Sequence, residues 1–495
     1  MKTWIVRALL GFGVLGSASA AFVACDNADQ CDFFRCLGSE DGGQDGGVDV
    51  APPGCDLSVD PGQSTPCIDD KVAIFVAPSS ANGNDSNPGT RAQPVATLTR
   101  ALEKAAASKP RVYVCKGDYT DNVNVTASRG IFGGFSCTDW SVNAAANPVT
   151  VAPSAGVPLT VHANDVTIAD IAFNAPPGSA ATTTSSIAAI VENALRVVLA
   201  RLRLIAGDAA NGADGQAAAA PPARALKGND ASGANGGPAQ PVSPQPCANG
   251  SGTTQGGGGG NEGADGGAGQ PFGVYDAGPN NTGAGGKGGS SCDKGANGAD
   301  GPAGSIGQGG SPIGSIQKGT WAPQDGKPGG VGLVGQGGGG GGGGGASTSS
   351  GGGGGGAGGC GGNAGNPGQG GGGSIALLSI RSDVTIISGT LTGKRAGDGG
   401  KGAAGQTGQP GGGAGASPTG LACAGGIGGA GGNGGAGGGG AGGVSAGILF
   451  SGTQPKTQDG PIITAAAAGG AAGAGAIAGT NDGVPGQAGA TVPIP

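Results

Sequence analysis

The stretch NDVTIADIAF at residues 164–173 recurs as LRVVLARLRL at residues 195–204, 31 positions further along the chain. Apolar residues hold the same positions in both stretches, whereas the polar residues between them differ. Alternation of apolar and polar residues is typical of β-strands that bury one face. The repeat therefore predicts coils that stack so that each buried row lies on the row below, as in a β-solenoid.

Two further copies of this pattern lie far downstream. The segment 186–208 resembles 374–398 (SIALLSIRSDVTIISGTLTGKRAGD), and GVSAGILF at 443–450 begins a weaker copy. Glycine dominates the residues between these copies. We therefore expect one β-rich body, from which long insertions leave at 207–373 and 396–442 and to which the chain returns each time.

Composition divides the chain into seven segments. They are a signal peptide at 1–24, a Cys-rich acidic stalk at 25–70, a β body at 71–206, a glycine-rich insertion at 207–373, a returning coil at 374–395, a second insertion at 396–442, and a last coil with a Gly/Ala-rich tail at 443–495. Within the β body, Leu98, Ala101, Leu102 and Ala105 stand at helical spacing. A short helix at 97–107 is expected to cover the N-terminal end of the coils, where strand edges are unpaired.

The first residues indicate export. Lys2 and Arg7 flank an apolar run that is too short to span a membrane, and small residues follow it. Cleavage after Ala20 and cleavage before Cys25 both fit the sequence. The run FVAC that ends at Cys25 resembles a bacterial lipobox, which implies a lipid on Cys25 and attachment to a membrane of the cell envelope or cell surface, with secretion as the alternative.

Cysteine numbers agree with an oxidising compartment. The chain has 11 cysteines, so a lipidated Cys25 leaves an even number for disulfides. Pairs adjacent in sequence are the candidates, although sequence does not fix connectivity, and buried free thiols are the alternative. The candidates are Cys31 with Cys36, Cys55 with Cys67, Cys115 with Cys137, Cys247 with Cys292, and Cys360 with Cys423.

Glycine supplies 120 of the 495 residues and aromatic residues only 3%, so the chain cannot bury one large ordinary core. Glycine recurs every third residue from Gly295 to Gly310, from Gly399 to Gly411 and from Gly425 to Gly443. This interval is that of a polyproline II helix, and it predicts a bundle of polyglycine strands. Disorder is the competing interpretation, because glycine loses the most backbone entropy on folding. Collagen is disfavoured, because the run from Gly337 to Gly345 breaks its pattern.

Three segments of the β body carry a resemblance to a known family. They are VAIFVAPSSANGNDSNPGTRAQPVATLTRALEKA at 72–105, RVYVCKGDYTDNVNV at 111–125 and GIFGGFSCTDW at 130–140. The chain resembles right-handed parallel β-helix surface proteins of the pectate-lyase-like superfamily over residues 71–206. The resemblance implies an all-β fold, namely a right-handed parallel β-helix with long glycine-rich insertions, more firmly than it implies an activity.

Charged residues and the lone histidine give few candidates for catalysis. The 31-residue shift places Asp165 beside Arg196 and Asp170 beside Arg201, which predicts ion pairs between coils or, alternatively, a cluster for polysaccharide chemistry. His162 is expected to be structural, and the sequence suggests no catalytic triad, phosphate loop, metal site or cofactor site.

These features favour a non-catalytic scaffold or adhesion lipoprotein of the cell surface or extracellular matrix. Its expected partners are the membrane, through the lipid anchor, and polysaccharide or matrix components. The first alternative is a carbohydrate-active lyase or hydrolase, and the second is a flat polyglycine surface that binds ice. Without Lys2 and Arg7, 23 basic residues face 32 acidic ones, so a nucleic-acid partner is not expected.

Overall fold

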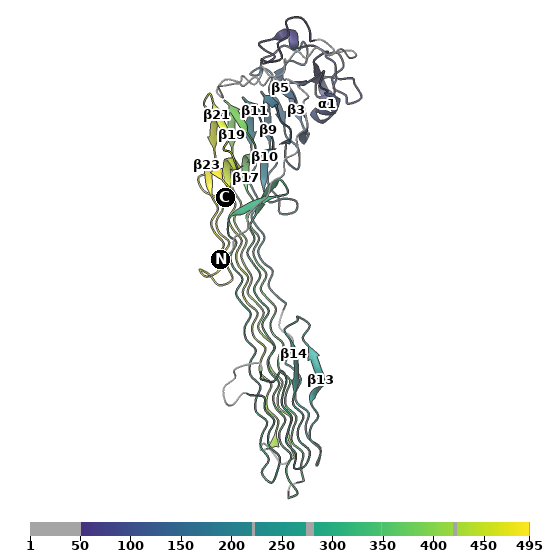
Figure 1. Ribbon diagram of the computed structural model, residues 1–495, viewed down its shortest axis with the longest axis vertical. Coiled ribbons are helices and arrows are strands. Elements are labelled where there is room, and N and C mark those ends of the chain that lie inside the picture. Colours follow the sequence, from purple (N-terminus) through teal and green to yellow (C-terminus); the bar gives the residue numbers. More distant parts are fainter. Residues whose placement is uncertain (1–50, 220–222, 274–281, 348, 419–422, 495) are drawn as a thin grey trace, which may run out of the picture.

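The computed structural model describes residues 51–219, 223–273, 282–347, 349–418 and 423–494. The expected signal peptide, the lipidation candidate Cys25 and the disulfide candidates Cys31 and Cys36 lie outside the described residues. A head rich in parallel strands continues into a long bundle of extended chain (Figure 1). Of the described residues, those at 51–206, 374–395, 444–465 and 488–494 form the head, and those within 207–373, 396–443 and 466–487 form the bundle.

Three parallel sheets form the head. The first sheet consists of β1 (Ala73–Val76), β2 (Arg111–Cys115), β5 (Gly130–Phe135), β8 (Val166–Ala169), β11 (Val197–Ala200), β18 (Val384–Ile387) and β21 (Lys456–Gln458). The second consists of β4 (Val123–Val125), β7 (Leu159–Val161), β10 (Ser186–Glu192), β17 (Ser374–Ile380), β20 (Ser445–Ser451) and β23 (Ala488–Pro493). The third consists of β3 (Gly117–Tyr119), β6 (Val149–Val151), β9 (Ala172–Asn174), β12 (Arg203–Ile205), β19 (Thr390–Thr392) and β22 (Ile462–Thr464).

The chain visits the second, first and third sheets in that order and then begins the next turn. Val197 on β11 pairs with Val166 on β8 and with Val384 on β18. The 31-residue repeat and its distant copy therefore lie side by side in one sheet, as the sequence predicts. The expected all-β class with parallel strands is confirmed.

Apolar side chains fill the space that the three sheets enclose. Val166, Val197 and Val384 form one buried row, and Leu204 and Leu391 belong to another. Each such side chain contributes about 1.5–3 kcal/mol when fully buried. Aligned rows of mostly aliphatic side chains thus contribute much of the stability of the head.

The outer faces of two sheets are also covered. Phe75, Tyr113 and Trp140 pack on the outside of the first sheet. On the outside of the second sheet lies an antiparallel hairpin from the bundle, β15 (Gly314–Gln317) and β16 (Thr320–Pro323), whose Trp321 packs against apolar side chains of that sheet. Sequence reasoning did not anticipate this hairpin.

Helix α1 (Leu98–Lys104) packs at the N-terminal end of the sheets, beside β1, β2 and β4. Thr97 caps it by accepting the N–H of Arg100, and the short 3₁₀ turn η3 (Ser79–Ala81) lies upstream. Leu98 and Ala101 are buried, as their spacing predicts. The helix stops at Lys104, earlier than the expected 107, because Ala105 already has an extended backbone.

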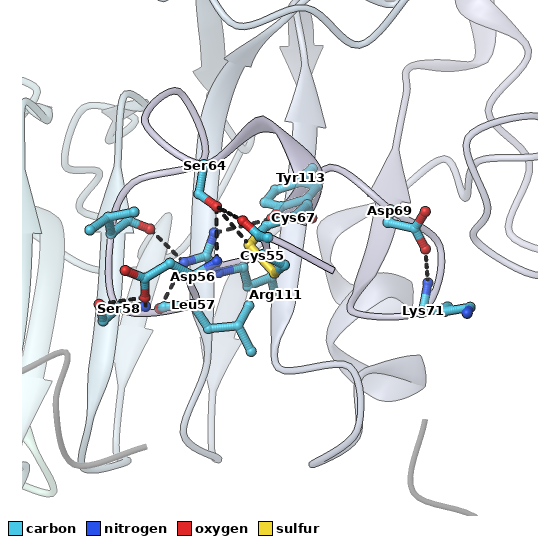
Figure 2. The surroundings of a disulfide bond; sticks show 12 residues. Cys55, Asp56, Leu57, Ser58, Ser64, Cys67, Asp69, Lys71, Arg111 and Tyr113 are labelled. Atoms are coloured by element: carbon cyan, nitrogen blue, oxygen red, sulfur yellow. Dashed lines mark hydrogen bonds between the residues drawn. A yellow bond between two sulfur atoms is a disulfide. The ribbon is translucent and has the colours of Figure 1, made fainter. Parts of the chain in front are cut away.

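Within the expected stalk at 25–70, of which residues 25–50 lie outside the described residues, residues 55–67 form a loop against β2 (Figure 2). Cys55 and Cys67 close the loop, which contains the 3₁₀ turn η2 (Thr65–Cys67). The guanidinium of Arg111 on β2 donates to the carbonyl oxygens of Leu57 and Val59 at 2.8 and 2.6 Å. Burial of Arg111 behind this loop explains why the segment follows the surface of the head.

Four disulfides link cysteines of the described residues. Cys55 bonds to Cys67 and Cys115 to Cys137, as adjacency in sequence suggested. The other two predicted pairings are wrong, because Cys247 bonds to Cys360 and Cys292 to Cys423. The reason is that neighbours in the bundle are strands far apart in sequence.

The bundle grows from one corner of the head. Each excursion leaves after a strand of the third sheet and returns to a strand of the second: from β12 to β17, from β19 to β20, and from β22 to β23. Stacked coils lie about 4.8 Å apart, so consecutive excursions start side by side. The last excursion, at 466–487, occupies what the sequence suggested was a tail. Farther along the bundle, β13 (Gln240–Pro246) and β14 (Thr253–Gly256) form a second hairpin (Figure 1).

Candidate functional site

The extended strands of the bundle are joined at every third residue. Gly295, Gly298 and Gly301 donate their N–H groups to the carbonyls of residues 424, 427 and 430, and the series continues to Gly310. A chain with three residues per turn directs its peptide groups to several sides in rotation, so each strand can bond to more than two neighbours. The glycine interval noted in the sequence therefore coincides with the hydrogen-bond interval.

Side chains have no room between these strands. A Cβ at Gly432 would overlap the carbonyl oxygen of Pro302, and one at Gly435 would overlap that of Ser305. The glycine run from Gly337 to Gly344 is buried in the interior of the bundle. Glycine is required here because backbones approach one another closely.

Asparagine and aspartate side chains cap N–H groups at the surface of the bundle. Asp208, Asn211 and Asp214 accept from the N–H groups of residues 395, 398 and 401 at 3.1, 2.9 and 2.7 Å. These three residues also stand at the three-residue interval. Their side-chain oxygens satisfy backbone N–H groups that would otherwise be free to pair with another strand.

A second row of the same kind lies on another strand. Asn297 and Asp300 accept from the N–H groups of Ile427 and Ala430 at 3.0 and 2.7 Å. Sequence reasoning missed both rows. The available signal was the recurrence of Asn or Asp every third residue, directly before Gly at Asn211, Asp214, Asn297 and Asp300.

Three buried serines clamp the chain where bundle strands leave the head. Ser186, Ser374 and Ser445 hold equivalent positions on β10, β17 and β20. Their hydroxyls accept the N–H groups of residues 207, 394 and 466 at 2.7, 2.8 and 2.9 Å. Each hydroxyl also donates to a backbone carbonyl, those of residues 176, 207 and 394. This serine ladder connects every excursion to the head.

The ion pairs expected between coils are present. Arg196 contacts both carboxylate oxygens of Asp165, at 2.5 and 2.7 Å. Arg201 contacts both oxygens of Asp170, at 2.8 and 2.7 Å, and it also reaches Asp60 at 2.8 Å. The hydrogen bonds that Arg201 donates to the carboxylate of Asp170 hold the pKa of Arg201 above its usual range.

The backbone at these four paired positions is left-handed, with φ between 52° and 59°. Arg196 and Arg201 are rare residues in that conformation. Each guanidinium is engaged by a carboxylate of the preceding coil, so the two pairs link stacked turns.

Other residues with reactive side chains are dispersed. His162, expected to be structural, lies 3.7 Å from Glu192 through its Nδ1 atom, and Lys287 contacts Asp265 at 2.8 Å. Ser445 lies in the sequence Gly-Val-Ser-Ala-Gly at 443–447 and is buried in the serine ladder. The structure does not bring these residues together.

Among the described residues, no group of three or more His, Cys, Asp or Glu side chains is arranged to hold a metal ion. No helix in that part of the chain is long and apolar enough to cross a membrane.

Comparison with known proteins gives one match. A family model described as "Protein of unknown function (DUF1565)" matches residues 81–126, which are 46 of the 495 residues, and that family is associated with parallel β-helix proteins. The matched segment contains α1 and the strands β2 to β4, at the covered end of the head. No curated protein and no solved structure matches the chain.

Proposed function

We propose that the chain is a non-catalytic scaffold of a bacterial cell surface or extracellular matrix, anchored by a lipid on Cys25. In this proposal the head is a right-handed parallel β-helix, and the bundle is a rigid rod of polyglycine strands that projects from it. The rod displays its turns and hairpins to other cells, matrix polymer or further copies of the chain.

The observation that carries the proposal is the hydrogen-bond register, which runs without interruption from head to bundle. Ala206 donates to Thr392 next to the paired strands β12 and β19. Ala209, Gly212 and Gly215 continue the ladder, and every acceptor stays 186 positions after its donor. A rod that shares its ladder with the head has a fixed direction. The strand at 351–373 alone has a length of roughly 70 Å at 3.1 Å per residue.

Other observations support the finer parts of the proposal. Parallel strands that pass through three sheets in one order are the arrangement of a β-helix, and crossover connections between parallel strands are right-handed in about 98% of cases. Four disulfides favour an oxidising compartment. The export pattern before Cys25 favours lipid attachment.

Fractionation and surface proteolysis of the source cells test the anchor and the location. We expect the wild-type chain in the membrane fraction, with the bundle cleaved by protease added to intact cells, and the Cys25→Ala variant in the soluble fraction. Equal fractionation of both chains would refute the lipid anchor. Full protection of the bundle in intact cells would refute display at the surface.

Adhesion tests the scaffold role itself. Cells that lack the chain should lose attachment to matrix or to one another, and a chain with residues 209–371 removed should not restore it. Unchanged attachment and matrix binding in cells without the chain would overturn the proposal.

A further inference from the structure

A four-residue arch rises from the hairpin of β13 and β14. Gln240 pairs with Gly256 and Gln245 pairs with Thr254, so the four residues 241–244 lie opposite Gln255 alone. The side-chain amide of Gln255 donates to the carbonyls of Pro241 and Val242, both at 3.0 Å. These two hydrogen bonds hold the arch to strand β14.

The crown of this arch is apolar and open to solvent. Val242 is 81% exposed, the largest value among the exposed large hydrophobic residues of the described chain, and Ser243 and Pro244 are also exposed. No Asp, Glu, Lys, Arg or His occurs from residue 231 to residue 261. Proline rings and the Cys247–Cys360 disulfide beside the arch restrict its motion, which lowers the entropy lost on binding.

An apolar cavity of about 370 Å³ lies where the hairpin of β15 and β16 meets the last strands of the head. Its lining includes Ile313, Trp321, Leu449, Val484, Pro493 and Ile494, and no lining side chain carries a charge. The Nε1 atom of Trp321 is buried and has no hydrogen-bond partner among the described residues.

The arch and the cavity of one molecule cannot meet. Gly355 donates to Gly257 beside the base of the arch. From Gly355 the strand runs 18 residues to Gly373 at the head, roughly 55 Å of extended chain. Figure 1 likewise places β13 and β14 far along the bundle from the head.

We propose that the crown of the arch, Val242 to Pro244, docks in the Trp321 cavity of a second copy of the chain. Both surfaces are uncharged and mostly apolar, with Ser243 in the crown and Gln487 in the lining as polar side chains, so docking buries apolar area and desolvates no charge. The contact joins two different surfaces, so it is heterologous and generates open-ended chains of molecules. This inference deepens the proposed scaffold role and rests on it, because it names the chain itself as a partner.

Sedimentation of the full-length mature chain tests the inference. Wild-type protein should form species larger than dimers as its concentration rises. Val242→Asp places a charge on the crown, and Ile494→Asp places one in the lining of the cavity. Because either charge would have to be desolvated on docking, each variant alone should remain monomeric. A mixture of the two should form dimers and nothing larger, because only one competent arch and one competent cavity remain.

Leu226→Asp is the matched control, because Leu226 is an exposed apolar residue of the bundle that lies outside both surfaces. It should associate like the wild type. Association of Val242→Asp and Ile494→Asp at the wild-type level, or equal loss in Leu226→Asp, would overturn the inference.

A peptide spanning residues 238–246 tests docking directly, because the positive result uses the unaltered cavity of the Val242→Asp variant. Added to Ile494→Asp it should leave Trp321 fluorescence unchanged, whereas added to Val242→Asp it should change that fluorescence with saturation. A peptide with Asp at position 242 should require at least about tenfold more material. No response to the first peptide would overturn the inference while leaving the cell-surface measurements, and hence the scaffold role, untouched.

Discussion

Gly412 and Gly413 are neighbours in the strand 396–417, yet only one of them has room for a side chain. A Cβ at Gly412 would overlap the carbonyl oxygen of Leu226, whereas at Gly413 the nearest atom, Cγ of Lys227, is 3.7 Å away. We expect Gly412→Ala to destabilise the bundle by about 1–3 kcal/mol, as overpacking does.

Gly413→Ala is the control, and it should be neutral or stabilising by up to about 1 kcal/mol through the unfolded chain. Calorimetric melting of the full chain compares the two variants. Equal melting temperatures would show that the backbones are not in close contact.

Asp121 links the stability of the head to pH. Its carboxylate accepts from the N–H of Leu98 and the hydroxyl of Thr99, both at 3.2 Å, at the start of α1. Burial raises the pKa of Asp121 above the ordinary aspartate value of 3.8 in spite of these hydrogen bonds. The folded chain thus binds the carboxyl proton of Asp121 more tightly than the unfolded chain does. The stabilisation from protonated Asp121 is therefore fully present below pH 3.8, and it is lost as pH rises through the pKa of Asp121 in the folded chain.

Asp121→Asn should therefore flatten the fall in melting temperature as pH rises from 3.8 toward neutrality. Asp139→Asn should change the pH profile in the opposite sense, because hydrogen bonds from Ser136 and Ser141 lower the pKa of Asp139. Parallel pH profiles for wild type and Asp121→Asn would contradict this account.

Among the elements, β17 carries two buried serines with different roles. Ser374 accepts the N–H of Lys394 and donates to the carbonyl of Gly207, whereas the buried hydroxyl of Ser379 has no hydrogen-bond partner in the part of the chain that the structure describes. Ser374→Ala leaves the buried carbonyl of Gly207 and the partly buried N–H of Lys394 without this partner, so we expect the free energy of unfolding to fall by about 1–3 kcal/mol.

Ser379→Ala should be neutral or slightly stabilising, since no hydrogen bond is lost. Chemical denaturation of both variants measures the difference. Similar midpoints would mean that the serine ladder does not connect the bundle to the head.

The strands were more predictable than the connections between strands. The shared apolar pattern of 164–173 and 195–204 fixes which residues stack, because a shift by one position would expose the buried row. The predicted disulfide between Cys247 and Cys292 was wrong, since distance in sequence does not determine which bundle strands become neighbours. Asp208 and Asn211 were overlooked because their role depends on a strand 187 positions away.

At the scale of the whole molecule, the head acts as a template that sets the register of the bundle strands. Ordering glycine loses more backbone entropy than ordering any other residue, which made disorder a serious alternative in the sequence. Three features offset that loss of entropy. They are a backbone hydrogen bond at every third residue, two disulfides across the bundle, and strands that leave the head already in register. Sequence supplied the three-residue interval but could not supply the register, which is set by the stacked coils.

Residue-resolved amide hydrogen exchange on the full chain tests this central claim most directly. The N–H groups of Gly295, Gly298, Gly301 and Gly304 donate to the parallel strand 423–443. We predict slow exchange at these glycines and faster exchange at the exposed residues Asp300 and Ala303 between them, with protection repeating every third position. Uniformly fast exchange through residues 294–310 would show that the glycine strands are not joined, and it would contradict both the rod and its continuity with the head.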